Sequence, residues 1–142
     1  MNERIRLAQA REEIARCFPV IVELRPHLEA EAFVEQVLRQ QRDGYRLAYL
    51  EDAGEVQACA GYRFSESLSW GYFMYVDDLV TASSARSKGY GGELLDWLVV
   101  QAREQGCAQF HLDSGVQRFA AHGLYLKNRL HITAHHFARP LS

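Results

Sequence analysis

Residues 78–95 read DLVTASSARSKGYGGELL, and this stretch decides how the chain folds. An apolar strand-like segment ends at Leu79 and Val80, a polar loop follows, and an amphipathic helix begins near Gly92. Between them, residues 86–91 form the pattern Arg-x-x-Gly-x-Gly. Glycines at a strand-to-helix turn let the backbone approach a ligand. The unpaired amides of the helix N-terminus then favour a phosphate or pyrophosphate.

Other interpretations of this turn are possible on residue grounds alone. The glycines could serve only the geometry of a tight turn. A dinucleotide fold or a P-loop fits less well, because the Gly-x-Gly-x-x-Gly and Gly-Lys-Ser/Thr spacings are absent. Arg86 and Lys88 place positive charge in the turn, as a phosphate site requires.

Working outward from the turn, hydrophobic periodicity predicts ten elements in the order β-α-α-β-β-β-α-β-α-β. The expected strands span residues 4–9, 45–51, 55–64, 71–81, 109–113 and 131–138, and the expected helices span 10–24, 29–41, 92–105 and 116–127. We expect Pro19 to interrupt or bend the first helix. The fold class is therefore α/β (α+β), with a mixed, mostly antiparallel twisted sheet flanked by helices, in one domain over residues 1–142.

The turn and the element order together resemble the GNAT superfamily of acyl-CoA N-acyltransferases. Residues 86–91 stand where that family has its Gln/Arg-x-x-Gly-x-Gly/Ala signature, and residues 79–81 stand on its central strand. The resemblance implies that this strand runs parallel to the strand over 109–113 and parts from it to form a cleft for coenzyme A. It also implies an enzyme that transfers an acetyl group from acetyl-CoA to a primary amine by direct attack, without a metal.

The resemblance further implies which residues hold the donor. Strand backbone would pair with the pantetheine arm, the amides of the turn would contact the phosphates, and a side chain after the next strand would contact the pantetheine. These residues are Leu79, Val80, Thr81, Arg86, Ser87, Lys88, Gly89, Tyr90, Gly91, Gly92 and Ser114. Ser114 could instead cap the following helix.

Tyr125 stands where many members of the family carry the tyrosine that protonates the leaving thiolate of coenzyme A. A phenol is a suitable donor to a thiolate of similar basicity. Gly123 and Leu124 depart from the Arg-Phe pair that is common before this tyrosine. Plain packing is the alternative role for Tyr125.

A general base is needed because a protonated amine cannot attack a thioester. Asp77 and Asp78 are the candidates, since they precede the residues expected to contact coenzyme A. Each could instead cap a bulge or pair with an arginine. Asp113 could line the acceptor pocket or cap a helix.

For the acceptor, the resemblance points to residues 18–28, with Arg25 and His27, and to an aromatic patch of Tyr62, Phe64, Trp70 and Tyr72. Arg25 could bind a carboxylate of the acceptor or a helix C-terminus. The acceptor itself is expected to be a small molecule or a peptide.

Composition excludes several other classes. The net charge of -2 argues against broad binding to nucleic acid or to an acidic membrane, and no apolar run is long enough for a membrane span. The three scattered cysteines and the unclustered histidines predict a reduced, cytoplasmic protein without a metal site.

An exposed last strand invites a homodimer. The alternative function is a CoA-binding sensor or interaction module that lacks turnover.

Overall fold

The computed structural model describes residues 2–142 and divides the chain into two compact units, one ending at Leu112 and the other beginning at Asp113. In the described part of the first unit, five strands form one mixed sheet in the order β1-β2-β3-β4-β5. Neighbours are antiparallel except for β4 and β5, which run parallel. The strands are β1 (Ile5–Leu7), β2 (Arg46–Asp52), β3 (Glu55–Ser67), β4 (Gly71–Thr81) and β5 (Gln109–Leu112).

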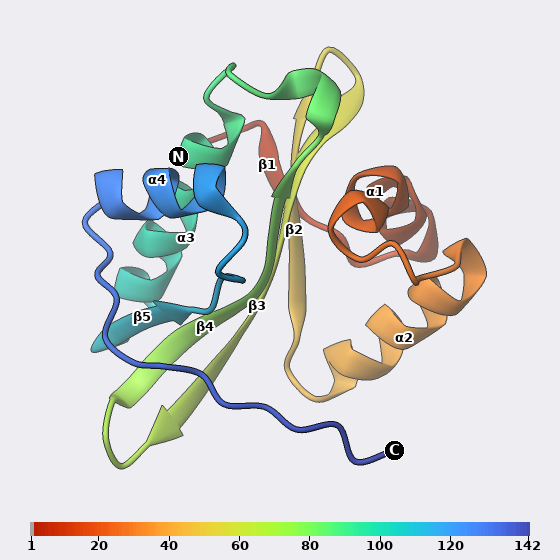
Figure 1. Ribbon diagram of the computed structural model, residues 1–142. Coiled ribbons are helices and arrows are strands. Elements are labelled where there is room, and N and C mark those ends of the chain that lie inside the picture. The colour runs from red at the N-terminus through yellow and green to blue at the C-terminus, as the bar shows by residue number, and fades with distance from the viewer. Residues whose placement is uncertain (1) are drawn as a thin grey trace. The chain divides into compact units, whose positions relative to one another are not determined.

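Three helices of this unit cover the sheet on both faces (Figure 1). α1 (Arg11–Leu24) and α2 (Ala30–Arg42) lie on one face, and α3 (Tyr90–Glu104) lies on the other. Each helix buries one apolar stripe against the strands; in α1 that stripe is Ile14, Cys17, Val20 and Ile21. The expected fold class and its element order up to the last helix are confirmed.

Helix α1 runs through Pro19 as one helix, so the interruption that the sequence suggested is wrong. Pro19 is exposed, while its neighbour Val20 is buried in the core. A proline costs a helix interior one hydrogen bond and some steric strain. The buried stripe on both sides of Pro19 holds the helix together despite that cost.

The β2–β3 hairpin turns on Ala53 and Gly54, whose φ angles are 55° and 79°. Two central residues with positive φ define the tight turn that matches the twist of antiparallel strands. Asp52 pairs directly with Glu55 across it. The hairpin predicted from the sequence is therefore confirmed.

Strand β4 carries a bulge at the place where the two aspartates stand. Asp78 is paired with Gly61 of β3, and Val76 is paired with Tyr62, so Asp77 is the extra residue. A bulge interrupts the usual alternation of side chains between the two faces of a strand. The odd numbers of Asp77, Leu79 and Thr81 therefore do not place Asp77 on the same face as the other two.

The second unit contains α4 (Phe119–Lys127), which is shorter at its start than the predicted helix over 116–127. Residues 131–138 have no regular secondary structure, so the predicted last strand is wrong. Its pattern is irregular, because His135 and His136 interrupt the alternation that a half-buried strand needs. The homodimer was expected to form along the edge of that strand, and residues 131–138 provide no such edge.

Candidate active site

After β4 the chain forms a short 3-10 helix at Ser83–Ala85 and then the phosphate turn, residues 86–92. The last three residues of this turn are the first three of α3. Ser87 and Gly89 have φ angles of 72° and 83°, a left-handed conformation that turns the chain sharply into α3. Gly89 is the N-cap, and α3 begins at Tyr90. The first amides of this helix stand at its positive end, which suits a pyrophosphate.

A network of polar side chains ties the phosphate turn to the first strands. The Tyr90 hydroxyl donates to Asp52 Oδ2 at 2.6 Å, and Arg4 Nη1 pairs with the same oxygen at 3.1 Å. Arg4 also pairs with Glu93 in the first turn of α3. The hydrogen bond from Tyr90 lowers the pKa of Asp52, with Arg4 as a smaller contribution. Tyr90 therefore anchors the turn through its side chain.

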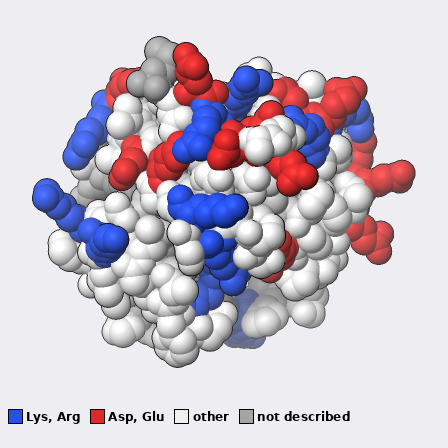
Figure 2. Space-filling model, turned by 90° about the horizontal axis from the view of Figure 1, so that it is seen from above, with Lys and Arg blue, Asp and Glu red and all other residues white. Residues whose placement is uncertain are grey.

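The charges around the phosphate turn are mixed in sign. Arg86 and Lys88 are exposed. Figure 2, a view from above, shows acidic and basic side chains mixed over the upper part of that face and several basic side chains near its centre. The amides at the start of α3, with Arg86 and Lys88 beside them, are the groups that a phosphate at the turn would meet.

Strand β5 ends beside the aspartates. It pairs with β4 along its whole length, from Phe73 to Val76, whereas β3 stays paired with β4 as far as Thr81. Residues 77–81 thus extend past the end of β5. Leu79, Val80 and Thr81 lie on this segment, directly before the loop to the phosphate turn.

Both aspartates of the bulge are held by arginines. Asp77 accepts two hydrogen bonds of 2.8 Å from Arg63, in a bidentate pair. Asp78 Oδ1 accepts from Arg25 Nε at 3.0 Å, and Arg25 Nη2 donates to the Asp77 carbonyl oxygen at 3.0 Å. Arg25 is thus bonded to β4. The sequence had suggested two other partners for it, a carboxylate of the acceptor or a helix C-terminus.

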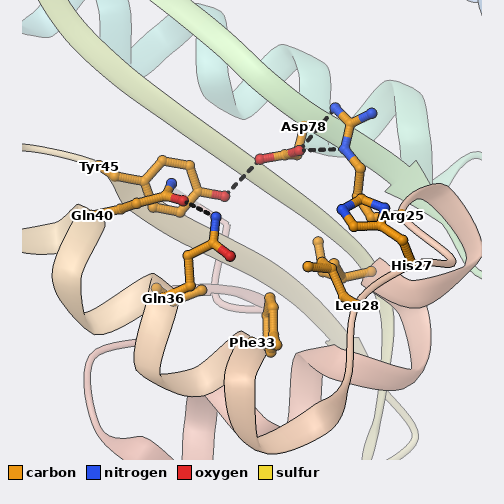
Figure 3. A pocket seen from close by; sticks show the side chains of 10 residues that line it. Arg25, His27, Leu28, Phe33, Gln36, Gln40, Tyr45 and Asp78 are labelled. Carbon is orange, nitrogen blue, oxygen red and sulfur yellow. Dashed lines mark hydrogen bonds and ion pairs between the residues drawn. The ribbon is translucent and has the colours of Figure 1, made fainter. Parts of the chain in front are cut away.

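Asp78 lines a cavity of about 330 Å³ between β4 and the α1–α2 region (Figure 3). The polar lining comes from Arg25, His27, Gln36, Gln40, Tyr45 and Asp78. The apolar lining comes from Ile21, Leu28, Phe33 and Val37. The sequence suggested residues 18–28 for an acceptor region, and four of them line this cavity: Ile21, Arg25, His27 and Leu28.

Tyr45 completes the surroundings of the Asp78 carboxylate. Its hydroxyl donates to Asp78 Oδ2 at 2.8 Å, as the dashed line in Figure 3 marks. Burial, and then the charge of Asp78, raise the pKa of the Tyr45 phenol well above its ordinary value. Tyr45 therefore remains a hydrogen-bond donor over the whole physiological range of pH.

Gly61 makes this hydrogen bond possible. A Cβ atom at residue 61 would lie 1.7 Å from the Tyr45 hydroxyl oxygen and 2.7 Å from Asp78 Oδ2. Neither Gly61 nor Tyr45 was singled out from the sequence. A glycine inside an otherwise apolar strand is the signal that could have found them, because it often marks a close approach of other atoms.

The aromatic patch expected to contact the acceptor is not part of this cavity lining. Tyr62 packs edge-on against Trp97 of α3, with ring centroids 6.3 Å apart, which places it on the opposite face of the sheet from α2. Phe64 stacks on Tyr72, and Trp70 stacks on His111. Along β3, side chains alternate between the two faces, so Tyr62 and Phe64 lie on the opposite face of the strand from Gly61.

The remaining predicted site residues lie in the second unit. Tyr125 is on α4, where burial raises the pKa of its phenol and Arg118 acts in the opposite direction. Asp113 pairs with His136 at 3.0 Å. Ser114 follows it in the segment before α4. Among residues 2–142, no group of three or more histidine, cysteine, aspartate or glutamate side chains is arranged to hold a metal ion. No helix in that range is long and apolar enough to cross a membrane.

Strand β4 thus carries a cavity-lining carboxylate and leads, through a short 3-10 helix, into a glycine turn at the N-terminus of α3. The model of the acetyltransferase (GNAT) family matches residues 7–129 of this chain, a range that extends into both units. This chain therefore belongs to the GNAT family. Members of the family generally use acetyl-CoA and act on small-molecule or peptide amines.

Similar proteins agree with this assignment. An uncharacterized N-acetyltransferase, YhdJ of Bacillus subtilis, is 34% identical over 134 residues, which are 93% of this chain and 94% of that protein. The crystal structure of a transcriptional regulator from Bacillus halodurans superposes with a TM-score of 0.86, at 19% identity, over 96% of this chain and 98% of the other. A GNAT family acetyltransferase from Staphylococcus aureus gives a TM-score of 0.81 at 18% identity, over 96% and 97% of the two chains. The two structures support the fold, and the Bacillus subtilis relative supports N-acetyltransferase activity.

Proposed function

We propose that this protein transfers the acetyl group of acetyl-CoA directly to a primary amine bound beside Asp78. The observation that carries the proposal is the position of this carboxylate. It lines the cavity beside α1 and α2 and directly precedes the segment over residues 79–81, which extends past the end of β5. The phosphate turn comes a few residues after the end of β4. A donor held by the turn and an acceptor held in the cavity would meet at this segment.

The reaction is a simple acyl transfer. The lone pair of the amine nitrogen attacks the thioester carbonyl carbon, a nitrogen–carbon bond forms, and the carbon–sulfur bond breaks. A backbone amide near Leu79 stabilises the developing oxyanion. The amine loses one proton to a base, and the departing thiolate gains one from an acid, so that amide and free coenzyme A are the products.

Asp78 is the better candidate for the base. Each carboxylate oxygen has two lone pairs, so Asp78 can accept from Tyr45, Arg25 and an incoming amine together. Its side chain is 17% exposed and borders the cavity. Asp77 is paired with Arg63 and does not line the cavity, so it has no access to an amine bound there, and we assign it to the geometry of the bulge.

Tyr125 is proposed as the acid that protonates the thiolate. The residue type suits the task, because a phenol carries a proton at neutral pH and can donate it to a thiolate of similar basicity. Its helix α4 is continuous through Gly123, so the departure from the usual Arg-Phe pair does not break the helix. Replacement of Tyr125 by phenylalanine tests this role, with turnover expected to fall while the affinity for acetyl-CoA is unchanged.

Calorimetric titration with acetyl-CoA tests the proposal at its first step. We expect binding by the wild-type protein, with ATP and NAD as negative controls, and loss of binding in Gly89→Asp because a carboxylate repels the pyrophosphate. Gly106→Asp is the matched control. Gly106 has a φ of 79°, close to the 83° of Gly89, but it follows the other end of α3.

Each outcome has a distinct meaning. Well-folded protein that does not bind acetyl-CoA contradicts the proposal. Equal losses of acetyl-CoA binding in Gly89→Asp and Gly106→Asp would show that the phosphate turn is not the binding site of the donor. Selective binding without acetylation of any amine, and without an effect of Tyr125→Phe on slow thioester hydrolysis, would favour a CoA-binding sensor of the same fold.

A further inference from the structure

The cavity beside Asp78 holds few charges, and these charges offset one another. Its only acidic lining residue is Asp78, and Arg25 is paired with that carboxylate at 3.0 Å. His27 also lines the cavity, and the phenol of Tyr45 is neutral. One ammonium group at Asp78 would share that carboxylate with Arg25, and a second ammonium would have no acidic partner among the lining residues.

The wall across the cavity from Asp78 is apolar. Figure 3 shows Phe33 and Leu28 facing the carboxylate from the far side. Phe33 is 4% exposed and packs against Phe18, with ring centroids 5.6 Å apart, so its ring is held in place. A hydrocarbon group on the acceptor would gain from contact with this wall, while a charged group would lose hydration there.

The remaining polar groups near the wall are neutral amides. Gln36 Nε2 donates to Gln40 Oε1 at 2.9 Å, and both side chains project from α2 toward the cavity. Two of the donors of Arg25 are directed to the strand at Asp77 and Asp78. A carboxylate on the acceptor would therefore compete with Asp78 for the guanidinium of Arg25.

The size of the cavity also restricts the acceptor. Its volume of about 330 Å³ lies near the lower end of the range of about 300–1,000 Å³ for ligand pockets. A single ring or a short branched chain with an amine fills such a space, and the rest of a larger acceptor would lie outside it.

From these contacts we infer that the acceptor is a small primary monoamine with an aromatic or branched alkyl body, bound with its nitrogen at Asp78 and its body on Phe33 and Leu28. The inference rests on the proposed function, since it names the acceptor of that same reaction. It excludes as preferred acceptors the polyamines, the aminoglycosides and free amino acids.

A panel of four amines tests the inference by the release of free coenzyme A from acetyl-CoA. The panel is 2-phenylethylamine, phenylalanine, spermidine and ethanolamine, which differ by an added carboxylate, added ammonium groups or a missing apolar body. We expect kcat/KM for 2-phenylethylamine to exceed each of the others by about tenfold or more. Preference for spermidine, phenylalanine or ethanolamine overturns the inference.

Substitutions at Gln36 test the charge argument without touching the core. Gln36 is exposed on α2, so its variants are expected to fold. Gln36→Glu adds a second carboxylate, and we expect kcat/KM for spermidine to rise about tenfold relative to 2-phenylethylamine. Gln36→Met, which has similar length and no charge, is the control and should not shift the preference toward spermidine. No change in the ratio with Gln36→Glu contradicts the placement of the acceptor in this cavity.

Substitution of Phe33 tests the apolar wall. Phe33→Ala should raise KM for 2-phenylethylamine about tenfold or more and leave the affinity for acetyl-CoA unchanged. Val34→Ala is the control, because Val34 is also buried on α2 but does not line the cavity. Equal effects of the two variants would overturn the assignment of Phe33 to the acceptor.

The outcomes separate this inference from the proposed function. Acetyl transfer to spermidine or to phenylalanine in preference would leave the function standing and remove only the acceptor class. Acetyl-CoA binding with no acetylation of any amine of the panel overturns the inference while the donor site stands. Absence of acetyl-CoA binding removes the function, and the acceptor class falls with it.

Discussion

At the scale of single residues, Gly61, Tyr45 and Asp78 form one unit. The phenol of Tyr45 occupies the space above residue 61 and donates to the Asp78 carboxylate at 2.8 Å. Arg25 holds the other oxygen of the same carboxylate. The position of the proposed base therefore depends on a residue that has no side chain.

Replacement of Gly61 by alanine should be strongly destabilising. The new Cβ would lie 1.7 Å from the Tyr45 hydroxyl oxygen and 2.4 Å from its ring carbon Cζ, and the buried ring has little room to move. We expect a loss of about 1–3 kcal/mol in the free energy of unfolding, measured by urea denaturation.

Gly123→Ala is the control for this substitution. A Cβ at residue 123 of α4 would meet no atom within 4 Å, and alanine is the better helix former. We expect it to leave the stability unchanged or slightly raised. A Gly61→Ala variant as stable as the wild type would contradict the close packing of Tyr45.

The two aspartates should differ in kinetics. Asp78→Asn keeps the shape of the side chain and removes its capacity to take a proton, so kcat/KM for the best amine should fall about 100-fold or more. Asp77→Asn weakens the pair with Arg63 and should have a much smaller effect on kcat. Steady-state assays with parallel calorimetry should show unchanged binding of acetyl-CoA in both. The reverse order would make Asp77 the base.

At the scale of elements, each helix is positioned by contacts at its ends as well as by its apolar stripe. The Glu13 carboxylate accepts hydrogen bonds from the backbone amides of Ala10 at 3.0 Å and Gln9 at 3.2 Å, at the start of α1. The Ser83 amide donates to Glu23 of α1 at 2.9 Å, which ties the loop after β4 to that helix. α1 thus contacts both the loop that leads into the phosphate turn and, through Arg25 at its C-cap, the bulge.

The cap of α1 should make stability depend on acid pH. Hydrogen bonds from Ala10 and then Gln9 lower the pKa of Glu13 below its ordinary value of 4.5. A lowered pKa in the folded state means that the contribution is present above that value and is lost as the pH falls through the folded pKa. Glu13→Gln should therefore cost about 0.5–1 kcal/mol near neutral pH, and the difference from the wild type should shrink in acid.

Urea denaturation at about pH 7 and about pH 3 measures this dependence. Glu12→Gln is the control, because Glu12 lies in the same first turn and is exposed. We expect it to have a smaller effect that changes less with pH. A cost of Glu13→Gln that is the same at both pH values would show that the carboxylate does not act as the cap.

At the scale of the whole molecule, the donor is expected to act on stability by mass action. A ligand that binds only the folded state at about 100 times its Kd adds about 2.7 kcal/mol to the free energy of unfolding. For a chain of 142 residues this should raise Tm by about 5–15 °C, measured by differential scanning fluorimetry with acetyl-CoA. The Gly89→Asp variant should show no such rise, while Gly106→Asp should respond as the wild type does.

Much of the fold was predictable because local patterns and global topology agree. The strand over 71–81 follows from its density of Tyr, Phe, Val and Leu. The hairpin turn at residues 52–54 follows from a short turn segment with a glycine, whose φ is positive in the structure. The tail over 131–138 was predicted as a strand and has no regular structure. A strand needs hydrogen-bonding neighbours, and a single irregular pattern does not specify them.

The candidate site was predictable only in part. The phosphate turn is local, since its glycines and the following helix are consecutive in the chain, and the family match supports it. The surroundings of Asp78 join residues 25, 45, 61 and 78, which are far apart in the sequence. No periodicity links such residues, because their proximity arises from the pairing of β3 with β4 and from the packing of α1 on the sheet.

The sequence by itself determined the class of this protein, because the turn, its glycines and the element order are local and sequential properties of the chain. The tertiary structure decided which side chains surround the two aspartates, and so which of them borders a cavity. The bulge that skips Asp77 and the missing side chain of Gly61 are effects of strand register and close packing. Such effects depend on contacts between distant segments, and these exist only once the chain has folded.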